Sequence, residues 1–249
     1  MKIDFRWNLF LLLFLLLQGC TNPAEKNTNT NKQETAAPEI QISETIIAPE
    51  HKQHPADFVP QGYNIFEEIN GDLNKDGIAD KILIIKGSSK DEFFKDEYRG
   101  ELDRNRRGII ILFKKKEGYD LAAKNYDCFS SENEDGGVYF APELSVTAEK
   151  GKLCIHYAHG RYGYWTYTFR YKNSDFELIG YDSSDNNGPE VNSETSINFL
   201  TKKKLIRRNT QEEDKDGEAV FEETWEDIKL DKPYKLSEIK DFDELEVTE

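Results

Sequence analysis

Several signatures of common enzyme classes are missing from this 249-residue sequence. It has no G-x-S-x-G nucleophile elbow, no HExxH pair, no Walker loop and no dinucleotide glycine fingerprint. Carboxylates are so numerous that no two of them stand out as a glycosidase pair. The sequence therefore shows no recognisable catalytic set. The open alternative is a periplasmic hydrolase whose carboxylates come together only in the folded chain.

Basic residues are outnumbered by acidic ones. Lys and Arg number 33 against 48 Asp and Glu, which gives a formal net charge of −15 at pH 7. Such a chain repels the phosphates of nucleic acids and anionic lipid head groups, and it concentrates divalent cations near its surface. Nucleic acid is thus excluded as an expected partner.

Long apolar runs are also scarce, and the main one is Leu9–Leu17. Nine residues are too few to span a bilayer, which needs roughly 20, but they suit the apolar core of a secretory signal. Lys2 and Arg6 supply the positive charge that precedes such a core. We expect residues 1–19 to be a signal peptide.

The leader ends in Leu17-Gln18-Gly19-Cys20, which resembles the lipobox of bacterial lipoproteins. The resemblance implies that Cys20 is lipidated and anchors the chain to a membrane of the cell envelope; an ordinary signal peptide beside an unrelated cysteine is the alternative. Thr21 stands where inner-membrane lipoproteins of enteric bacteria have aspartate, so we expect the outer membrane of a Gram-negative bacterium. The sequence leaves the leaflet open.

Cysteine is rare, with three in the chain. Once Cys20 is assigned to the lipid, Cys128 and Cys154 remain as one pair that could form a disulfide in an oxidising compartment. Free thiols in strands are the alternative.

Residues 20–56 lack aromatic side chains and are rich in Asn, Thr, Pro, Glu and Gln. Such a composition cannot bury enough apolar surface to offset its conformational entropy, so we expect a disordered tether. Residues 57–249 are long enough for one extracytoplasmic domain with a substantial core.

The domain reads as a series of short runs rich in β-branched and aromatic residues, separated by Gly, Asn and Asp. The expected strands cover residues 81–86, 108–113, 119–125, 144–150, 152–158, 164–172, 175–182, 195–201, 203–210 and 218–227. The segment YTFRYKNSDFELIGY is expected to form a hairpin. Short helices are expected near Pro60–Ile69 and over residues 236–245, with Ser237 as the N-cap. We predict a mainly β fold of antiparallel sheets, either a sandwich or a partial propeller-blade-like arrangement. A closed propeller is excluded because no repeat of 20–50 residues is present.

The stretch GDLNKDGIAD places oxygen-bearing side chains at alternate positions and follows them with a glycine that permits a sharp turn. Calcium prefers six to eight hard oxygen ligands, which this spacing can supply. The residue at the twelfth position is Leu83 rather than the glutamate of an EF-hand, and a buried strand follows, so an EF-hand is excluded. The expected ligands are Asp72, Asn74, Asp76, the carbonyl of Ile78, and Asp80. A polar turn without metal is the alternative.

The same loop resembles the D-x-N-x-D-G-x-x-D loop of FG-GAP and integrin-propeller blades and of dockerins, which implies a structural calcium ion. With its flanks FVPQGYNIFEEI and KILII, and with RRGIIILFKKKEGYDLAAKN, YWTYTFRYKNSDFELIGYD and SETSINFLTKKKL in this order, it resembles a family of uncharacterised bacterial lipoproteins. That resemblance implies location and fold and brings no activity.

Aromatic residues concentrate in HGRYGYWTYTFRY, residues 159–171. Tyr, Trp and Arg often anchor interfaces, so Arg161, Tyr162, Tyr164 and Trp165 are candidates for binding an envelope protein or a glycan; sheet packing is the alternative. The set Cys154, His156 and His159 has the spacing of a transition-metal site, but ordinary strand and loop histidines are expected instead. Taken together, the sequence predicts a lipid-anchored envelope protein with a calcium-stabilised, non-enzymatic binding domain.

Overall fold

The computed structural model describes residues 49–136, 139–211 and 219–247. The predicted leader, Cys20 and the tether up to residue 48 lie outside this part of the chain. Within the described residues, strands predominate and no helix is long and apolar enough to cross a membrane. The fold is mainly β, with antiparallel sheets and no closed propeller, as predicted.

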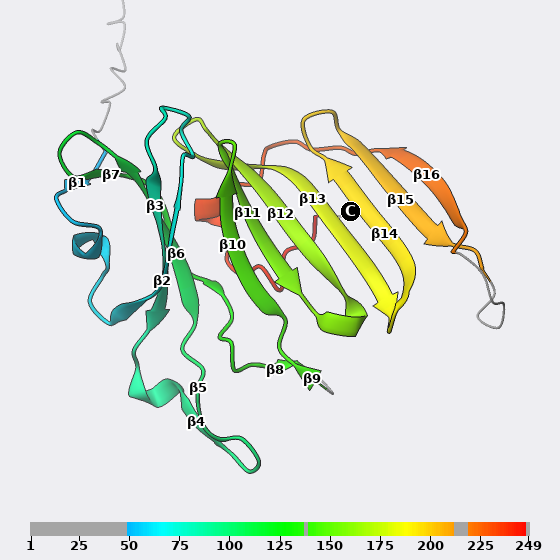
Figure 1. Cartoon of the computed structure of the whole chain (residues 1–249), viewed down its shortest axis with the longest axis horizontal. Helices are drawn as coiled ribbons and strands as arrows, with labels where there is room; N and C mark the ends of the chain where they lie inside the picture. The colour runs from blue at the N-terminus through cyan, green and yellow to red at the C-terminus, as the bar shows by residue number, and fades with distance from the viewer. Residues whose placement is uncertain (1–48, 137–138, 212–218, 248–249) are drawn as a thin grey trace, which may run out of the picture. The chain divides into compact units, whose positions relative to one another are not determined.

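One sheet has five antiparallel strands (Figure 1). In spatial order they are β1 (His51–Lys52), β7 (Tyr119–Phe129), β6 (Arg107–Lys114), β3 (Asp80–Gly87) and β2 (Tyr63–Gly71). The two central strands are almost continuously apolar, with Ile82–Ile85 and Ile109–Leu112 fully buried. Such runs are expected where both faces of a sheet are covered.

The other large sheet has seven antiparallel strands that follow one another in chain order (Figure 1). They are β10 (Glu143–Glu149), β11 (Lys152–Ala158), β12 (Gly163–Lys172), β13 (Asp175–Asn187), β14 (Glu190–Asn198), β15 (Lys203–Asn209) and β16 (Phe221–Asp227). The predicted hairpin is β12–β13. Its turn residues Asn173 and Ser174 have φ values of 52° and 59°, as a type I′ turn requires.

The remaining elements are short. They comprise the pairs β4 (Phe93–Asp96) with β5 (Gly100–Asp103) and β8 (Asp135–Gly136) with β9 (Tyr139–Phe140), and the 3₁₀ turns η1 (Pro55–Phe58), η2 (Lys90–Glu92), η3 (Gly160–Tyr162) and η4 (Leu236–Glu238).

A single core joins the two large sheets. One face of β3 and β6 contributes Ile84 and Ile111, and the inner face of the seven-stranded sheet contributes Ile155 and Phe169. The C-terminal segment completes this core through a group of buried apolar side chains: Leu236, Ile239, Phe242 and Val247. A second, smaller cluster covers the other face of the five-stranded sheet, where Phe58 of η1 packs against β3 and β6.

The helix predicted near residues 60–69 is wrong, and the one predicted over residues 236–245 forms only as the short 3₁₀ helix at residues 236–238. Residues 60–69 form most of β2, which pairs with β3. A bulge between Ile65 and Glu67 hides the strand periodicity, because it moves Ile69 into the main core while Ile65 packs on the opposite cluster. Near the C-terminus only the short turn η4 forms, and Ser237 donates its hydroxyl to Asp175 instead of capping a helix.

The ordered domain also begins before Asp57. His51 and Lys52 pair with Asp120 and Tyr119 as strand β1, within the range predicted to be a tether. The composition of this segment is polar, but it pairs with β7 at two ladder positions, and Phe58 of the following turn η1 is buried.

Cys128 and Cys154 are free thiols, so the disulfide that the sequence allowed does not form. Cys128 is fully buried in the main core. Cys154 lies between Leu153 and Ile155, which point into that core, and strand alternation therefore places its side chain on the opposite face of the sheet. The sheet itself separates the two sulfur atoms.

Candidate functional site: the acidic loop and the sheet surfaces

The acidic loop between β2 and β3 is held by its own side chains. Asp72 accepts hydrogen bonds from the backbone N–H groups of Asp76 (3.1 Å) and Gly77 (3.0 Å). Asn74 Oδ1 accepts from the same N–H of Asp76 at 2.9 Å, and its amide donates to Asp76 Oδ2 at 3.0 Å. Asp76 Oδ1 in turn accepts from the backbone N–H of Ile78 at 2.8 Å. Three of the predicted ligands are thus brought together.

Two residues of the loop adopt the left-handed backbone conformation. Lys75 has φ of 64°, and Gly77, at the position where the sequence predicts a sharp turn, has φ of 85°. Glycine adopts a positive φ without the steric cost that a Cβ brings, which explains its place at this position.

Asp80 has a different role from its neighbours. Its side chain is fully buried, and Oδ2 accepts the N–H of Leu73 (2.9 Å) and the more distant N–H of Asn74 (3.4 Å). Oδ1 accepts the N–H of Lys114, at the end of β6, at 3.0 Å. Burial raises the pKa of this carboxyl, against the effect of the three backbone donors. Asp80 therefore closes the loop onto the sheet.

Because Asp80 already accepts three backbone N–H groups, its oxygens are less available to calcium than the sequence predicts. Among the described residues, no three His, Cys, Asp or Glu side chains form a group that could hold a metal ion. The oxygens that remain for an ion belong to Asp72, Asn74, Asp76 and the carbonyl of Ile78, with Asp80 Oδ1 able to accept one further interaction. This donor set is made of hard oxygens, as calcium requires.

The predicted aromatic platform is divided between two faces. Trp165 lies on the inner face of the seven-stranded sheet, where it stacks on Tyr157 with ring centroids 5.3 Å apart. Tyr164 lies on the outer face, next to His156 at 5.6 Å. Arg161 and Tyr162 belong to η3 and line a separate hollow of about 290 Å³. The four residues do not form one surface, because adjacent strand residues point to opposite faces.

Cys154 and His156 share the outer face of β11, and His156 Nδ1 is hydrogen-bonded to Thr166 at 2.7 Å. His159 packs against Tyr162 and Trp165 in the loop that follows. His156 is thus a hydrogen-bonded strand residue, and His159 is a loop residue in contact with aromatic rings.

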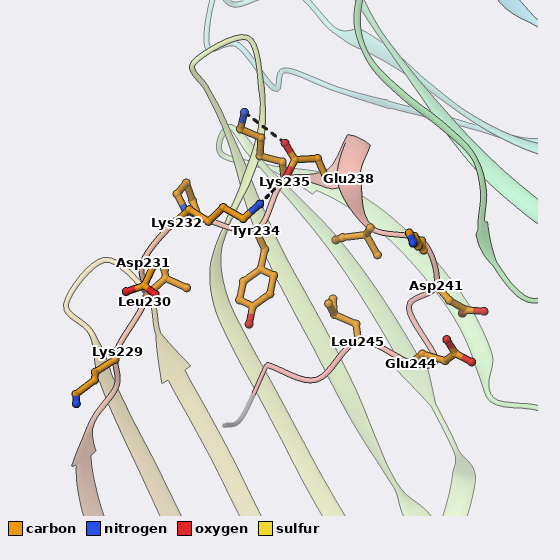
Figure 2. A pocket seen from close by; sticks show the side chains of 13 residues that line it. Lys229, Leu230, Asp231, Lys232, Tyr234, Lys235, Glu238, Asp241, Glu244 and Leu245 are labelled. Atoms are coloured by element: carbon orange, nitrogen blue, oxygen red, sulfur yellow. Dashed lines mark ion pairs between the residues drawn. The ribbon is translucent and has the colours of Figure 1, made fainter.

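The C-terminal segment lines a pocket of about 650 Å³ (Figure 2). Figure 2 shows Glu238 between Lys232 and Lys235, with ion-pair distances of 3.8 and 3.7 Å. Asp241, also in this pocket, pairs with Arg106 at 2.8 Å. Glu238 and Asp241 are thus ion-paired, while Asp231 and Glu244 also line the pocket. The hydrolase alternative stays a prediction.

A pair of strands with complementary charge was missed at the sequence level. Strand β15 (KKLIRRN) carries four cations and strand β16 (FEETWED) four carboxylates, and the two strands are hydrogen-bonded neighbours. The signal was present in the sequence as two expected strands of opposite charge.

Comparison with known proteins gives no match to the chain among family models, curated proteins or solved structures.

Proposed function

We propose that this chain is a lipid-anchored protein of the cell envelope whose β domain is stabilised by a structural calcium ion and acts as a non-enzymatic binding module for an envelope protein or a glycan. The leader and Cys20 support the location, and the absence of recognised catalytic motifs from the sequence supports a binding role. The family resemblance described above points to the same location.

The observation that carries the calcium part of the proposal is the convergence of Asp72, Asn74 and Asp76 on one turn. Asp72 and Asn74 both accept the backbone N–H of Asp76, so their oxygens lie close to each other. The same turn carries the carboxylate of Asp76, so hard oxygens and two negative charges lie in one short loop. Calcium bound by these residues and by the carbonyl of Ile78 would use those oxygens as ligands.

The size of the effect is modest. For a dissociation constant near the ~0.1–1 mM typical of extracellular modules, millimolar calcium stabilises the fold by about 0.4–1.4 kcal/mol. The loop would therefore strengthen a domain that already folds through its core.

Calorimetric titration of the full chain with calcium tests this part. Asp76→Asn keeps the side-chain oxygen that accepts from Ile78 but removes the charge, and Asp231→Ala removes an exposed carboxylate elsewhere. We expect binding heat for the parent and for Asp231→Ala, and little for Asp76→Asn. Equal heats in all three proteins would show that this loop does not bind calcium.

A further inference from the structure

The last strand of the seven-stranded sheet has one unpaired edge. Strand β16 pairs with β15 on one side and ends the sheet on the other, where the described residues add no further strand (Figure 1). An open edge presents backbone donors and acceptors that another strand can pair with.

The hydrogen-bond pattern shows which residues present these groups. The N–H of Ile228 donates to Lys202, and the carbonyl of Val220 accepts from Thr210, so the even-numbered residues of β16 point their backbone groups toward β15. In an antiparallel ladder the direction alternates with each residue. The free N–H and C=O groups therefore belong to Phe221, Glu223, Trp225 and Asp227.

The side chains of these four residues share one face of the sheet. Across the ladder, Asp227, Trp225 and Glu223 stand opposite Lys203, Leu205 and Arg207. The ion pairs measure 2.6 Å for Lys203–Asp227 and 3.4 Å for Arg207–Glu223. A strand that pairs with this face of β16 in the way β15 does therefore carries a cation, an apolar residue and a cation at alternate positions.

The side chains on this face of β16 remain accessible from the open edge. Trp225 is 63% exposed, and the side chains of Asp227 and Glu223 are 80% and 53% exposed although each is ion-paired. An exposed carboxylate can accept a second cation, and an exposed indole can cover a second apolar side chain.

We infer that the free edge of β16 binds an extended basic peptide segment of a partner protein by strand addition. This inference rests on the proposed role as a binding module and specifies its surface and its kind of partner. The segment carries cations opposite Glu223 and Asp227 and an apolar side chain opposite Trp225; its backbone completes the ladder, as in other strand-addition complexes.

The charge of β16 argues against a second copy of this chain as the occupant. Antiparallel pairing of two β16 edges about Trp225 would set Glu223 of one copy against Asp227 of the other. Like charges directly opposite each other destabilise a strand pair.

The test uses the full chain and a labelled, capped peptide with the sequence of residues 202–210, KKKLIRRNT, in a fluorescence anisotropy titration. Glu223→Pro removes a free-edge N–H without removing a β15 hydrogen bond, since proline is tolerated where the N–H faces solvent. Glu223→Gln is the matched control, because it removes the same charge and keeps the N–H. Thermal melts confirm that both variants fold.

We expect the parent to bind, Glu223→Pro to lose roughly tenfold or more in affinity, and Glu223→Gln to lose only about two- to fivefold. If Glu223→Pro does not fold, Trp225→Lys replaces it: this exposed substitution repels the peptide and should also cost roughly tenfold. A peptide with Glu at every Lys and Arg position should not bind.

Equal losses in the proline and glutamine variants would overturn strand addition in favour of charge attraction alone. Absence of binding to the parent, or equal binding of the acidic peptide, would also overturn the inference, as would self-association of the chain through β16 without peptide binding. None of these measurements depends on Cys20 or on calcium. A failure of peptide binding can therefore be distinguished from a failure of the lipid anchor or of the calcium site.

Discussion

The buried carboxylate of Asp80 links the acidic loop to the end of β6, and its removal should be costly. It holds the N–H groups of Leu73 and Lys114 at 2.9 and 3.0 Å, while the bond to Asn74 at 3.4 Å is too long to contribute much. Each bond to a charged acceptor contributes about 1.5–3 kcal/mol, so two bonds together contribute about 3–6 kcal/mol. The ionised carboxylate also bears a desolvation cost, as its raised pKa shows.

We therefore expect Asp80→Ala to lower the free energy of unfolding by about 2–4 kcal/mol at pH 7, out of the ~5–15 kcal/mol typical of a domain. Urea denaturation followed by circular dichroism measures this, and the slope with urea should not change. Asp231→Ala, at an exposed carboxylate, should stay within about 0.5 kcal/mol of the parent. A loss below about 0.5 kcal/mol for Asp80→Ala would refute the role of this carboxylate.

The pH dependence of the same variant has a definite sign. Because burial raises the folded-state pKa of Asp80, the folded state binds its proton more tightly than the unfolded state does. The contribution of Asp80 is then fully present below its unfolded pKa of about 3.9 and declines as pH rises through the folded pKa. The stability difference between parent and Asp80→Ala should shrink over that interval, and a difference that grows would contradict the burial argument.

Three further predictions concern packing and charge. Gly108→Ala would place a Cβ 2.1 Å from the carbonyl oxygen of Tyr126 and should destabilise the fold by about 3 kcal/mol or more. Gly180→Ala, where the nearest atom is 3.6 Å away, should be nearly neutral in the same denaturation assay. Equal effects of the two substitutions would contradict the packing. Lys86→Met removes the cation that contacts two carboxylates at 3.0 and 2.6 Å and should cost about 2–4 kcal/mol at neutral pH, and a neutral result would show that these ion pairs add nothing. In the folded chain a maleimide should modify the half-buried Cys154 and spare Cys128, whose thiol is fully buried with a raised pKa, and a mass increase of two protons on reduction would reinstate the disulfide.

Much of the strand pattern was predictable because it depends on local composition. The apolar runs that became β3 and β6 are β-branched and continuous, and β11 was predicted at its observed bounds of residues 152–158. The edge strand β2 was missed since its bulge after Ile65 breaks the two-residue period. Local pattern could not reveal that η4 would stay a single turn, because its buried residue Leu236 contributes to a core built from distant strands.

The candidate sites also divide into features set by local sequence and features set by contacts between distant residues. The convergence of Asp72, Asn74 and Asp76 is local and was predictable, but the contact from Asp80 to Lys114 joins residues 34 positions apart. The aromatic platform was overestimated, as Tyr164 and Trp165 share a segment but not a face. The open edge of β16 required the hydrogen-bond direction of a whole ladder, which composition does not give.

The proposed location at a membrane depends on lipidation of Cys20. Mass spectrometry of the N-terminal fragment of the protein, recovered from the membrane fraction of cells that make it, tests this most directly. We predict that the mature chain begins at Cys20 and that this residue carries the added mass of a diacylglyceryl group. A mature chain that begins elsewhere, or an unmodified Cys20, would contradict the proposed lipid anchor.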